Sequence, residues 1–410
     1  MKNTVCMSCR STALEKFLDL GEQPNGNFFP AADEVENEPR FPFSMLVCQD
    51  CWQVQIEEFP SPEFMFSNHP YITGVNMPVV DHFHRMADRL IEKYELKKNS
   101  LVLDIGCNDG TLLGIFADRG MRTFGVDPGQ RTGKLARENG VVVAETFWTE
   151  ASARAIRSLN FRPDLITATS VFYHLQDIHD FIRGLRQVMN ERTVFSAQCV
   201  YLLDVLEKNQ FDHFYHEHTM IHAVAPLKRL FESHGMRLLD VERYDVHGGS
   251  FVLDVGLENC VHPTRSSIEE TIRAEENAGL FEISTYRDFT ARVEKNRDDL
   301  RELLETLKAE GKTVDALGAP LKGSTLMNYC GIGPDLIRRA TEVNEFKIGK
   351  VTPGTHVPIV DENAPEIRAD PPDYYLLLAW NFADFFRKKY HDYLARGGRF
   401  ILPHPELQVI

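Results

Sequence analysis

The sequence predicts an α/β protein, and its 410 residues are enough for two to three domains. Two closely spaced cysteine pairs predict a small metal-binding domain over residues 1–70. Alternating strand and helix patterns predict a doubly wound, Rossmann-like domain over residues 71–260. After a charged helical linker, a second series of such patterns predicts a C-terminal Rossmann-like α/β domain, together spanning residues 261–410.

The cysteine pairs are Cys6-Met-Ser-Cys9 and Cys48-Gln-Asp-Cys51. Two such knuckles, a few tens of residues apart, predict one structural Zn²⁺ held by four thiolates, with no position open for catalysis. The rival interpretation is two disulfides, which a cytoplasmic location would keep reduced. The isolated cysteines are expected to be buried and structural, namely Cys107, Cys199, Cys260 and Cys330.

The strongest functional signal is the run from Val102 to Leu113, a buried strand that turns through glycines into a helix. Gly106 and Gly110 allow the backbone to turn tightly beside a ligand. Acidic side chains stand where the pyrophosphate of a dinucleotide would lie, so the loop favours the cationic S-adenosylmethionine. The loop resembles motif I of the class I methyltransferases. An ordinary glycine turn is the alternative.

About twenty residues later a second strand ends in Asp127, whose carboxylate can accept hydrogen bonds from both ribose hydroxyls. Phe147 and Thr169, after the third and fourth strands, are expected to flank the adenine. The predicted cofactor-binding residues are Asp104, Gly106, Asn108, Asp109, Gly110, Leu112, Asp127, Pro128, Phe147 and Thr169.

A helix is expected over 76–96, followed by five parallel strands near 101–106, 122–127, 141–145, 164–169 and 193–198. A final antiparallel pair, 236–244 and 250–257, is joined by a turn at His247-Gly-Gly249. This order is that of the methyltransferase variant of the doubly wound sheet.

Three histidines, a tyrosine and a glutamate lie within residues 211–218, after the fifth strand. His216 and His218 could bind a metal, or the histidines could lie on the surface of a polar helix start. A third interpretation is a general base whose pKa and tautomer are set by its neighbours. The position beside the usual acceptor site favours the base.

Residues 266–311 read as charged helix, with Glu275 among the solvated residues. Strands are then expected at 313–318, 374–379 and 399–402, forming a small parallel sheet. The loop from Gly318 to Gly323, with Lys322, could hold an anion, although a plain connecting turn explains it equally well.

The composition is that of a globular protein, with 43% hydrophobic and 26% charged residues. A net charge of -15 argues against a nucleic-acid partner. We expect neither a membrane span nor a signal peptide, hence a cytoplasmic protein with a small-molecule substrate. A monomer is compatible with the sequence.

Motifs along nearly the whole chain resemble the nucleotide-sugar C-methyltransferases of branched-chain deoxysugar synthesis. They are the cysteine knuckles, 108–113, Val171-Phe-Tyr-His174, Tyr215-His-Glu-His218, His247-Gly-Gly-Ser250, Gly318-Ala-Pro, Asn328-Tyr-Cys-Gly-Ile332, 347–359 and 376–381. The chain departs from the family pattern near the expected acceptor pocket, at Thr219-Met-Ile. The resemblance therefore implies a reaction class and leaves the sugar open.

The resemblance implies methylation at C3 of a 4-keto-6-deoxy sugar, usually linked to thymidine diphosphate. His218 is the expected base, with Tyr215 and Glu217 orienting it and Tyr71 or His174 near the C4 oxygen. The substrate-binding residues that follow are Lys322, Asn328, Tyr329 and His247. The alternatives are an O- or N-methyltransferase, a binding protein that has lost catalysis, and a metal-dependent hydrolase.

Overall fold

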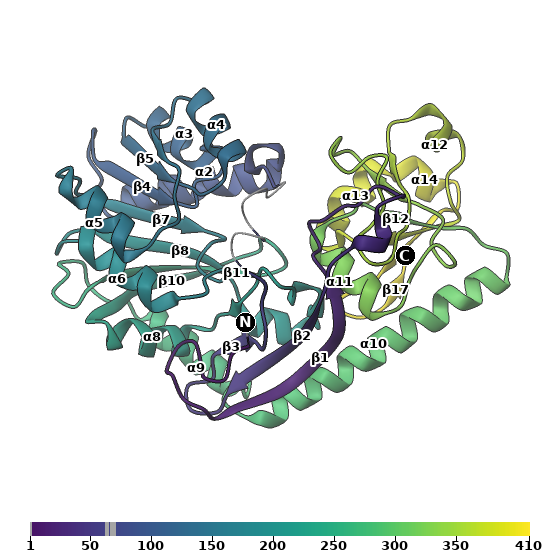
Figure 1. Ribbon diagram of the computed structural model, residues 1–410, viewed down its shortest axis with the longest axis horizontal. Helices are drawn as coiled ribbons and strands as arrows, with labels where there is room; N and C mark the ends of the chain where they lie inside the picture. The colour runs from purple at the N-terminus through teal and green to yellow at the C-terminus, as the bar shows by residue number, and fades with distance from the viewer. Residues whose placement is uncertain (1, 62–64, 66–70) are drawn as a thin grey trace.

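The computed structural model describes residues 2–61, 65 and 71–410. Three sheets form two lobes, which are joined along one side by long strands and a long helix (Figure 1). The expected end of the first domain, at residue 70, lies outside the described residues. None of the helices in the described ranges combines the length and apolar content needed to cross a membrane.

The N-terminal sheet is antiparallel, with strand order β1-β2-β3-β9. Its fourth strand comes from far along the chain, since β9 directly follows the histidine-rich segment and pairs with β3. The histidine-rich segment is therefore held against the N-terminal domain. The elements are β1 (Leu14–Pro24), η1 (Val35–Asn37), β2 (Arg40–Cys48), β3 (Val54–Ile56) and β9 (Met220–Ile221).

The central sheet has the order β10-β11-β8-β7-β4-β5-β6, in which β10 and β11 form the antiparallel hairpin. This is the expected methyltransferase arrangement, and the turn through Gly248 and Gly249 joins the hairpin with positive φ angles of 89° and 137°. The strands are β4 (Leu101–Ile105), β5 (Arg122–Val126), β6 (Val143–Ala144), β7 (Leu165–Thr169), β8 (Val194–Val200), β10 (Met236–Tyr244) and β11 (Ser250–Leu257).

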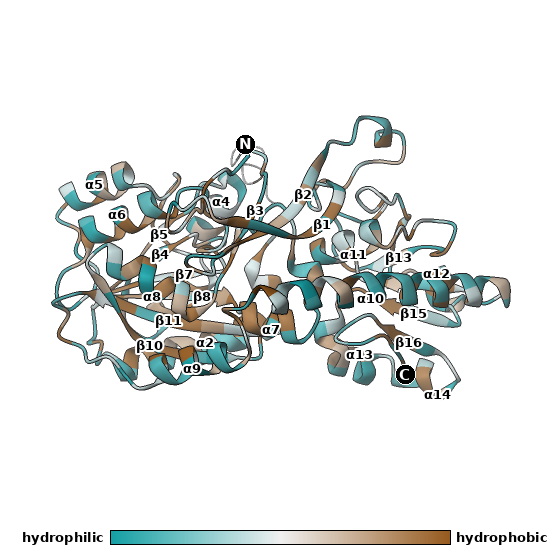
Figure 2. Ribbon diagram, turned by 90° about the horizontal axis from the view of Figure 1, so that it is seen from below, coloured by the Kyte–Doolittle hydropathy of each residue, from teal (hydrophilic) through white to brown (hydrophobic). Residues whose placement is uncertain are grey.

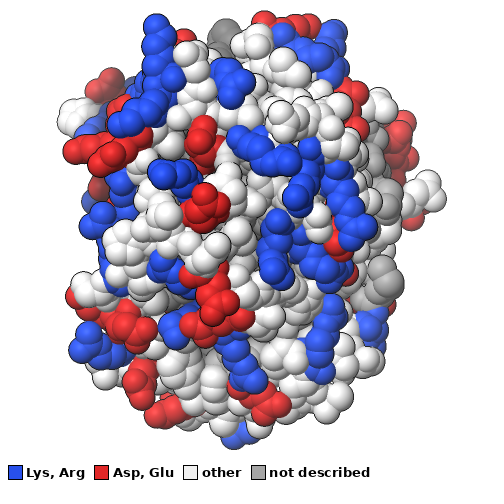
Figure 3. All heavy atoms as spheres, turned by 90° about the vertical axis from the view of Figure 1, so that its left-hand side faces the viewer, with Lys and Arg blue, Asp and Glu red and all other residues white. Residues whose placement is uncertain are grey.

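Helices cover both faces of the central sheet, as expected for a sheet of buried parallel strands (Figure 1). The helices of this lobe are η2 (Thr73–Val75), α2 (Met77–Lys93), α3 (Thr111–Asp118), α4 (Gln130–Glu138), α5 (Glu150–Ser158), α6 (Ile178–Val188), α7 (Leu202–Glu207), η3 (Phe211–His213) and α8 (Val224–Ser233). On the outer face of this lobe, basic and acidic side chains lie side by side (Figure 3).

The helical linker consists of α9 (Ser267–Asn277) and α10 (Ile283–Ala309), and α10 runs along both lobes (Figures 1 and 2). Tyr286 packs its ring against Phe17 of β1, with 5.2 Å between the ring centroids.

The expectation that Glu275 faces solvent is wrong. Its carboxylate is fully buried and accepts hydrogen bonds from the backbone N–H groups of Val224 and Ala225, at the start of α8.

The C-terminal sheet has the order β14-β13-β12-β15-β16-β17, parallel except for β17. Three of its strands were expected, whereas β13, β14 and β17 have at most three residues each and gave no readable pattern. The elements are β12 (Val314–Leu317), α11 (Leu321–Tyr329), β13 (Ala340–Glu342), β14 (Ile359–Asp361), α12 (Pro365–Ala369), β15 (Tyr374–Leu377), η4 (Trp380–Phe382), α13 (Ala383–Lys389), α14 (His391–Ala395), β16 (Arg399–Leu402) and β17 (Gln408–Val409).

Candidate active site

The four knuckle cysteines converge on one point of the N-terminal domain. Their sulfur atoms all lie within 4.8 Å of one another, and two of the pairs are 3.6 Å apart. Ligands of a tetrahedral zinc with Zn–S bonds of about 2.3 Å are separated by about 3.8 Å, so the donor set fits Zn²⁺. The backbone N–H groups of Ser8 and Cys9 donate to Cys6 Sγ at 3.4 Å, as a knuckle requires.

The loop between β4 and α3 is shaped for close approach of a ligand. Gly106 and Gly110 have φ angles of 73° and 77°, a region that side-chain-bearing residues rarely adopt. A Cβ atom on Gly106 would lie 2.3 Å from Val171 Cγ2, so only glycine fits there. Beneath the loop, burial raises the pKa of Asp104 to about 7, and the Thr167 hydroxyl donates to its carboxylate at 2.7 Å.

Asp127 lies directly after β5, as expected for a residue that holds a ribose. Its Oδ2 accepts from the Asn108 N–H at 2.8 Å, and its Oδ1 accepts from the Gly129 N–H and the Thr132 hydroxyl at 2.8 and 2.7 Å. The carboxylate is therefore fixed against the glycine loop. Of the other expected cofactor residues, Leu112 is buried, whereas Phe147 is 37% exposed beyond β6. The arrangement fits S-adenosylmethionine, and the individual contacts remain predictions.

Asp127→Ala is expected to weaken S-adenosylmethionine binding by about 1.5–3 kcal/mol, because charge-assisted hydrogen bonds contribute that much. Titration calorimetry measures the affinity. Glu138→Ala, in α4 and exposed, is the control and should bind normally. Unchanged affinity in the Asp127 variant would rule out the predicted role.

The segment that contains η2 lies on the same loop. The Asn108 side chain accepts from the Thr73 N–H at 3.0 Å and donates to the Tyr71 carbonyl at 3.1 Å. The Gly74 N–H donates to Asp109 Oδ2 at 2.8 Å. Tyr71 is thus placed beside the predicted cofactor site. Desolvation and the charge of Asp109 raise the pKa of Tyr71 to about 12, so its phenol is protonated at neutral pH.

Tyr215 and His218 are brought together by a tight turn, in which the His218 N–H donates to the Tyr215 carbonyl at 2.9 Å. Their ring centroids are 3.9 Å apart. The two rings therefore meet through this turn. Tyr173 packs edge-on against the same imidazole, with 4.6 Å between centroids.

The hydrogen bond of His218 determines which of its ring nitrogens carries the proton. Nδ1 lies 2.7 Å from the His213 carbonyl oxygen, which can only accept, so Nδ1 is the protonated nitrogen. Burial, reinforced by the neighbouring histidines, holds the pKa of His218 well below its usual value. The imidazole is therefore neutral at pH 7, with Nε2 as its basic nitrogen.

The remaining histidines of this region have separate surroundings. His174 Nδ1 donates to the Glu217 carbonyl at 2.6 Å, and its ring lies 5.1 Å from that of His218. His216 points away, because its ring packs against Phe41 and Phe43 of β2, with centroids 5.6 and 4.9 Å apart. Within the described ranges, the group of metal-binding side chains that comes together is the cysteine cluster.

On the C-terminal side, Lys322 reaches this region from α11. Its Nζ lies 4.1 Å from the centroid of the Trp380 ring and donates to Asn381 Oδ1 at 2.5 Å. Desolvation lowers the pKa of Lys322 to about 8 against the opposing effect of Asp212, so the ammonium is still charged at neutral pH. Burial, with the charge of Lys322 adding to it, lowers the pKa of His247 to about 4.

Two other residues expected to bind substrate make contacts within the protein. The Asn328 amide donates to the Ser324 and Pro353 carbonyls at 2.8 and 2.9 Å, and its oxygen accepts from Arg40 at 3.0 Å. Tyr329 packs edge-on against Phe211, with 5.5 Å between ring centroids. Both residues connect parts of the fold around Lys322.

Sequence reasoning missed Asp212 and Trp380. The Trp380 indole N–H donates to Asp212 Oδ2 at 2.6 Å, and His404 Nε2 lies 3.6 Å from Asp212 Oδ1. The C-terminal domain therefore holds the short helix η3, whose last carbonyl orients His218. The sequence did contain one signal for Asp212, namely its position inside the histidine-rich segment, residues 211–218.

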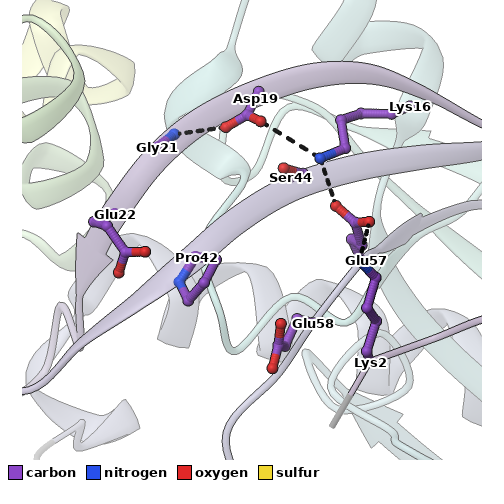
Figure 4. A pocket seen from close by; sticks show the side chains of 9 residues that line it. All are labelled: Lys2, Lys16, Asp19, Gly21, Glu22, Pro42, Ser44, Glu57 and Glu58. Carbon is purple, nitrogen blue, oxygen red and sulfur yellow. Dashed lines mark hydrogen bonds and ion pairs between the residues drawn. The ribbon is translucent and has the colours of Figure 1, made fainter.

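A surface hollow of about 360 Å³ lies elsewhere, on the N-terminal sheet (Figure 4). Lys16 and Lys2 form ion pairs with Glu57 across it, at 2.7 and 3.1 Å. None of its lining residues belongs to the expected site. The hollow is a solvated, ion-paired surface.

Comparison with known proteins gives matches along the chain. Residues 6–66 match a family model of a zinc-binding domain, 80–241 that of a methyltransferase domain, and 245–405 that of a C-methyltransferase C-terminal domain. The C-methyltransferase NovU of Streptomyces niveus is 35% identical over 407 residues, which cover 98% of this chain and 96% of the relative.

Solved structures with partial similarity include S-adenosylmethionine-dependent methyltransferases from Clostridium acetobutylicum and Anabaena variabilis. The first is 14% identical, covers 43% of this chain and 92% of its own, and has a TM-score of 0.36. The second is 13% identical, covers 42% of this chain and 83% of its own, and has a TM-score of 0.35.

Proposed function

Because this chain belongs to the family of C-methyltransferases that carry an N-terminal zinc-binding domain, we propose that it methylates C3 of a 4-keto-6-deoxy nucleotide sugar, with thymidine diphosphate as the expected nucleotide. The chain is a methyltransferase that uses S-adenosylmethionine. The observation that carries the proposal is the fixed tautomer of His218, whose Nδ1 donates to the His213 carbonyl at 2.7 Å. With the proton on Nδ1, the lone pair of Nε2 can accept a proton from carbon.

A sugar carbon beside a ketone becomes a nucleophile only after it loses a proton. His218 Nε2 takes the C3 proton, and the electron pair moves into the enolate, whose negative charge develops on the C4 oxygen. Tyr71, protonated at neutral pH, is a candidate donor to that oxygen, as is His174. The Gly106–Gly110 loop and Asp127 would hold S-adenosylmethionine, whose sulfonium would supply the electrophilic methyl group. As the bond from C3 to the methyl carbon forms, the methyl–sulfur bond would break, and the sulfur would keep the electron pair and leave as the neutral thioether S-adenosylhomocysteine.

The roles of the other residues follow from their surroundings. Tyr215 covers one side of the His218 ring and restricts its orientation. Lys322, still charged at neutral pH, and His247 supply groups for the diphosphate or the sugar, while Asn328 and Tyr329 shape the wall around them. The substrate is thus held between the central and C-terminal domains.

The test is proton exchange at C3. The purified enzyme, mixed with a dTDP-4-keto-6-deoxy sugar in D₂O, should exchange the C3 proton, as measured by NMR. An O- or N-methyltransferase has no need of an enolate. Methyl transfer to oxygen or nitrogen without C3 exchange would therefore replace this proposal.

Lys322→Ala is expected to raise the KM for the nucleotide sugar much more than the KM for S-adenosylmethionine, because a half-buried cation next to the acceptor site is lost. Steady-state kinetics with each substrate varied in turn measures the difference. Lys350→Ala, an exposed lysine of the same domain, is the control. Equal changes in both constants would indicate a folding defect.

The domain limits that we propose are 1–70, 71–260 and 261–410. The third limit follows the central sheet, whose last strand β11 ends at Leu257, whereas the C-terminal family match begins earlier, at residue 245. We place the enzyme in the cytoplasm, where the zinc-binding thiols stay reduced. Its net charge of -15 supports a small-molecule substrate over a nucleic acid.

A further inference from the structure

The loop between β1 and β2, residues 25–39, leaves the N-terminal sheet and lies on the C-terminal domain (Figure 1). The Glu38 carboxylate accepts from the Gly354 N–H at 2.8 Å and lies 2.9 Å from His356 Nε2. The Pro30 carbonyl accepts from the Val351 N–H at 3.1 Å. One end of this loop is therefore attached to the third domain.

The other end of the loop is a compact turn. The Asn25 side chain accepts from the Asn27 N–H at 3.0 Å, and the Asn25 carbonyl accepts from the Phe28 N–H at 2.9 Å. A Cβ atom on Gly26 would lie 3.0 Å from Leu321 Cγ, so the turn is packed against the start of α11. The backbone around Asn27 is thus held in place from two sides.

The Asn27 side chain extends from this turn to the histidine-rich segment, where its amide donates to Glu217 Oε1. The Glu217 residue is 4% exposed, precedes His218 in the chain, and accepts the His174 hydrogen bond through its carbonyl. A buried carboxylate is costly without hydrogen bonds, and an amide satisfies it without cancelling its charge. The Asn27–Glu217 contact therefore joins the N-terminal and central domains, next to the Gly26 turn that packs on the C-terminal domain.

We propose that Asn27 is a positioning residue for the methyl acceptor, and that it acts by holding the Glu217 carboxylate beside His218. The proposal rests on the function proposed above. A carboxylate can accept several hydrogen bonds, and one aimed into the acceptor site can bind a sugar hydroxyl. The N-terminal domain, in addition to its zinc site, thereby contributes a side chain to the active site.

The test is a double-mutant cycle in which the amide and the carboxylate exchange places between positions 27 and 217. Asn27→Ala should lower kcat/KM for a dTDP-4-keto-6-deoxy sugar at least about tenfold, and Asn27→Asp should cost more, because two carboxylates then face each other. Glu217→Gln should also lose activity. The double variant N27D/E217Q restores an amide–carboxylate pair and should recover part of the loss of N27D.

Controls separate positioning from folding. Asn37→Ala, exposed in the same loop, should keep full activity, and all variants should keep their zinc and their affinity for S-adenosylmethionine. A normal kcat/KM in Asn27→Ala, or strictly additive losses in the cycle, would overturn the inference. The C3 exchange of His218→Ala is measured in the same series. If His218→Ala abolishes exchange while the Asn27 variants keep normal activity, the proposed function stands and only the role of Asn27 is wrong. If His218→Ala retains exchange, the proposed base is wrong.

Discussion

His218→Ala is expected to lower kcat by at least about 100-fold, the lower range for the loss of a general base. The affinity for S-adenosylmethionine should stay nearly unchanged, because the cofactor loop and Asp127 are made by β4 and β5, away from this turn. His218→Asn should behave similarly, since an amide nitrogen does not accept a proton at neutral pH. Single-turnover methyl transfer and calorimetry measure the two quantities separately.

His216→Ala is the matched control for this prediction. The His216 ring packs between Phe41 and Phe43, so its loss should lower thermal stability and leave kcat close to that of the parent enzyme. C3 exchange at the normal rate in His218→Ala would show that another residue is the base. Tyr71 and His174, which lie near the same site, would then be tested next.

Replacing one zinc ligand, as in Cys48→Ser, is expected to lower the free energy of unfolding by more than about 4 kcal/mol, the range typical of a lost structural metal. The N-terminal sheet is small and depends on the metal for stability. Metal analysis should find about one zinc in the parent and much less in the variant. Denaturant unfolding measures the stability.

Cys260→Ala, a buried cysteine outside the cluster, is the control and should retain zinc. The zinc prediction fails if the purified parent enzyme is well folded and active while its four knuckle thiols are metal-free. Loss of zinc should also disturb the Asn27 loop, which extends from the same sheet.

The features that the sequence predicted well depend on local patterns. The glycine loop, the strand ending in Asp127 and the antiparallel hairpin each follow from a few adjacent residues, and the structure contains all three. The full-length relative confirms the family resemblance that the motifs indicated. Cysteine knuckles are likewise local, and the structure brings their four sulfur atoms together.

The features that were missed depend on contacts between distant segments. Glu275 is surrounded by charged residues in the sequence, which is typical of a solvated helix face. In the fold, however, the N-terminus of α8 packs against its carboxylate. Asn27 and Glu217 are 190 positions apart, and nothing in either local sequence indicates their contact. His216 and His218 share one motif, but the turn sends their side chains to different surroundings.

Strand β9 has a consequence for recombining enzymes of this family. Its two residues complete the N-terminal sheet, with Val54 opposite Ile221, although they belong to the central portion of the chain. A chimera that exchanges only an N-terminal module at a boundary near residue 70 would therefore graft a sheet that lacks its matching last strand. Hybrid enzymes built to accept new sugars should exchange residues 211–221 together with the N-terminal module, so that sheet and acceptor turn come from one parent.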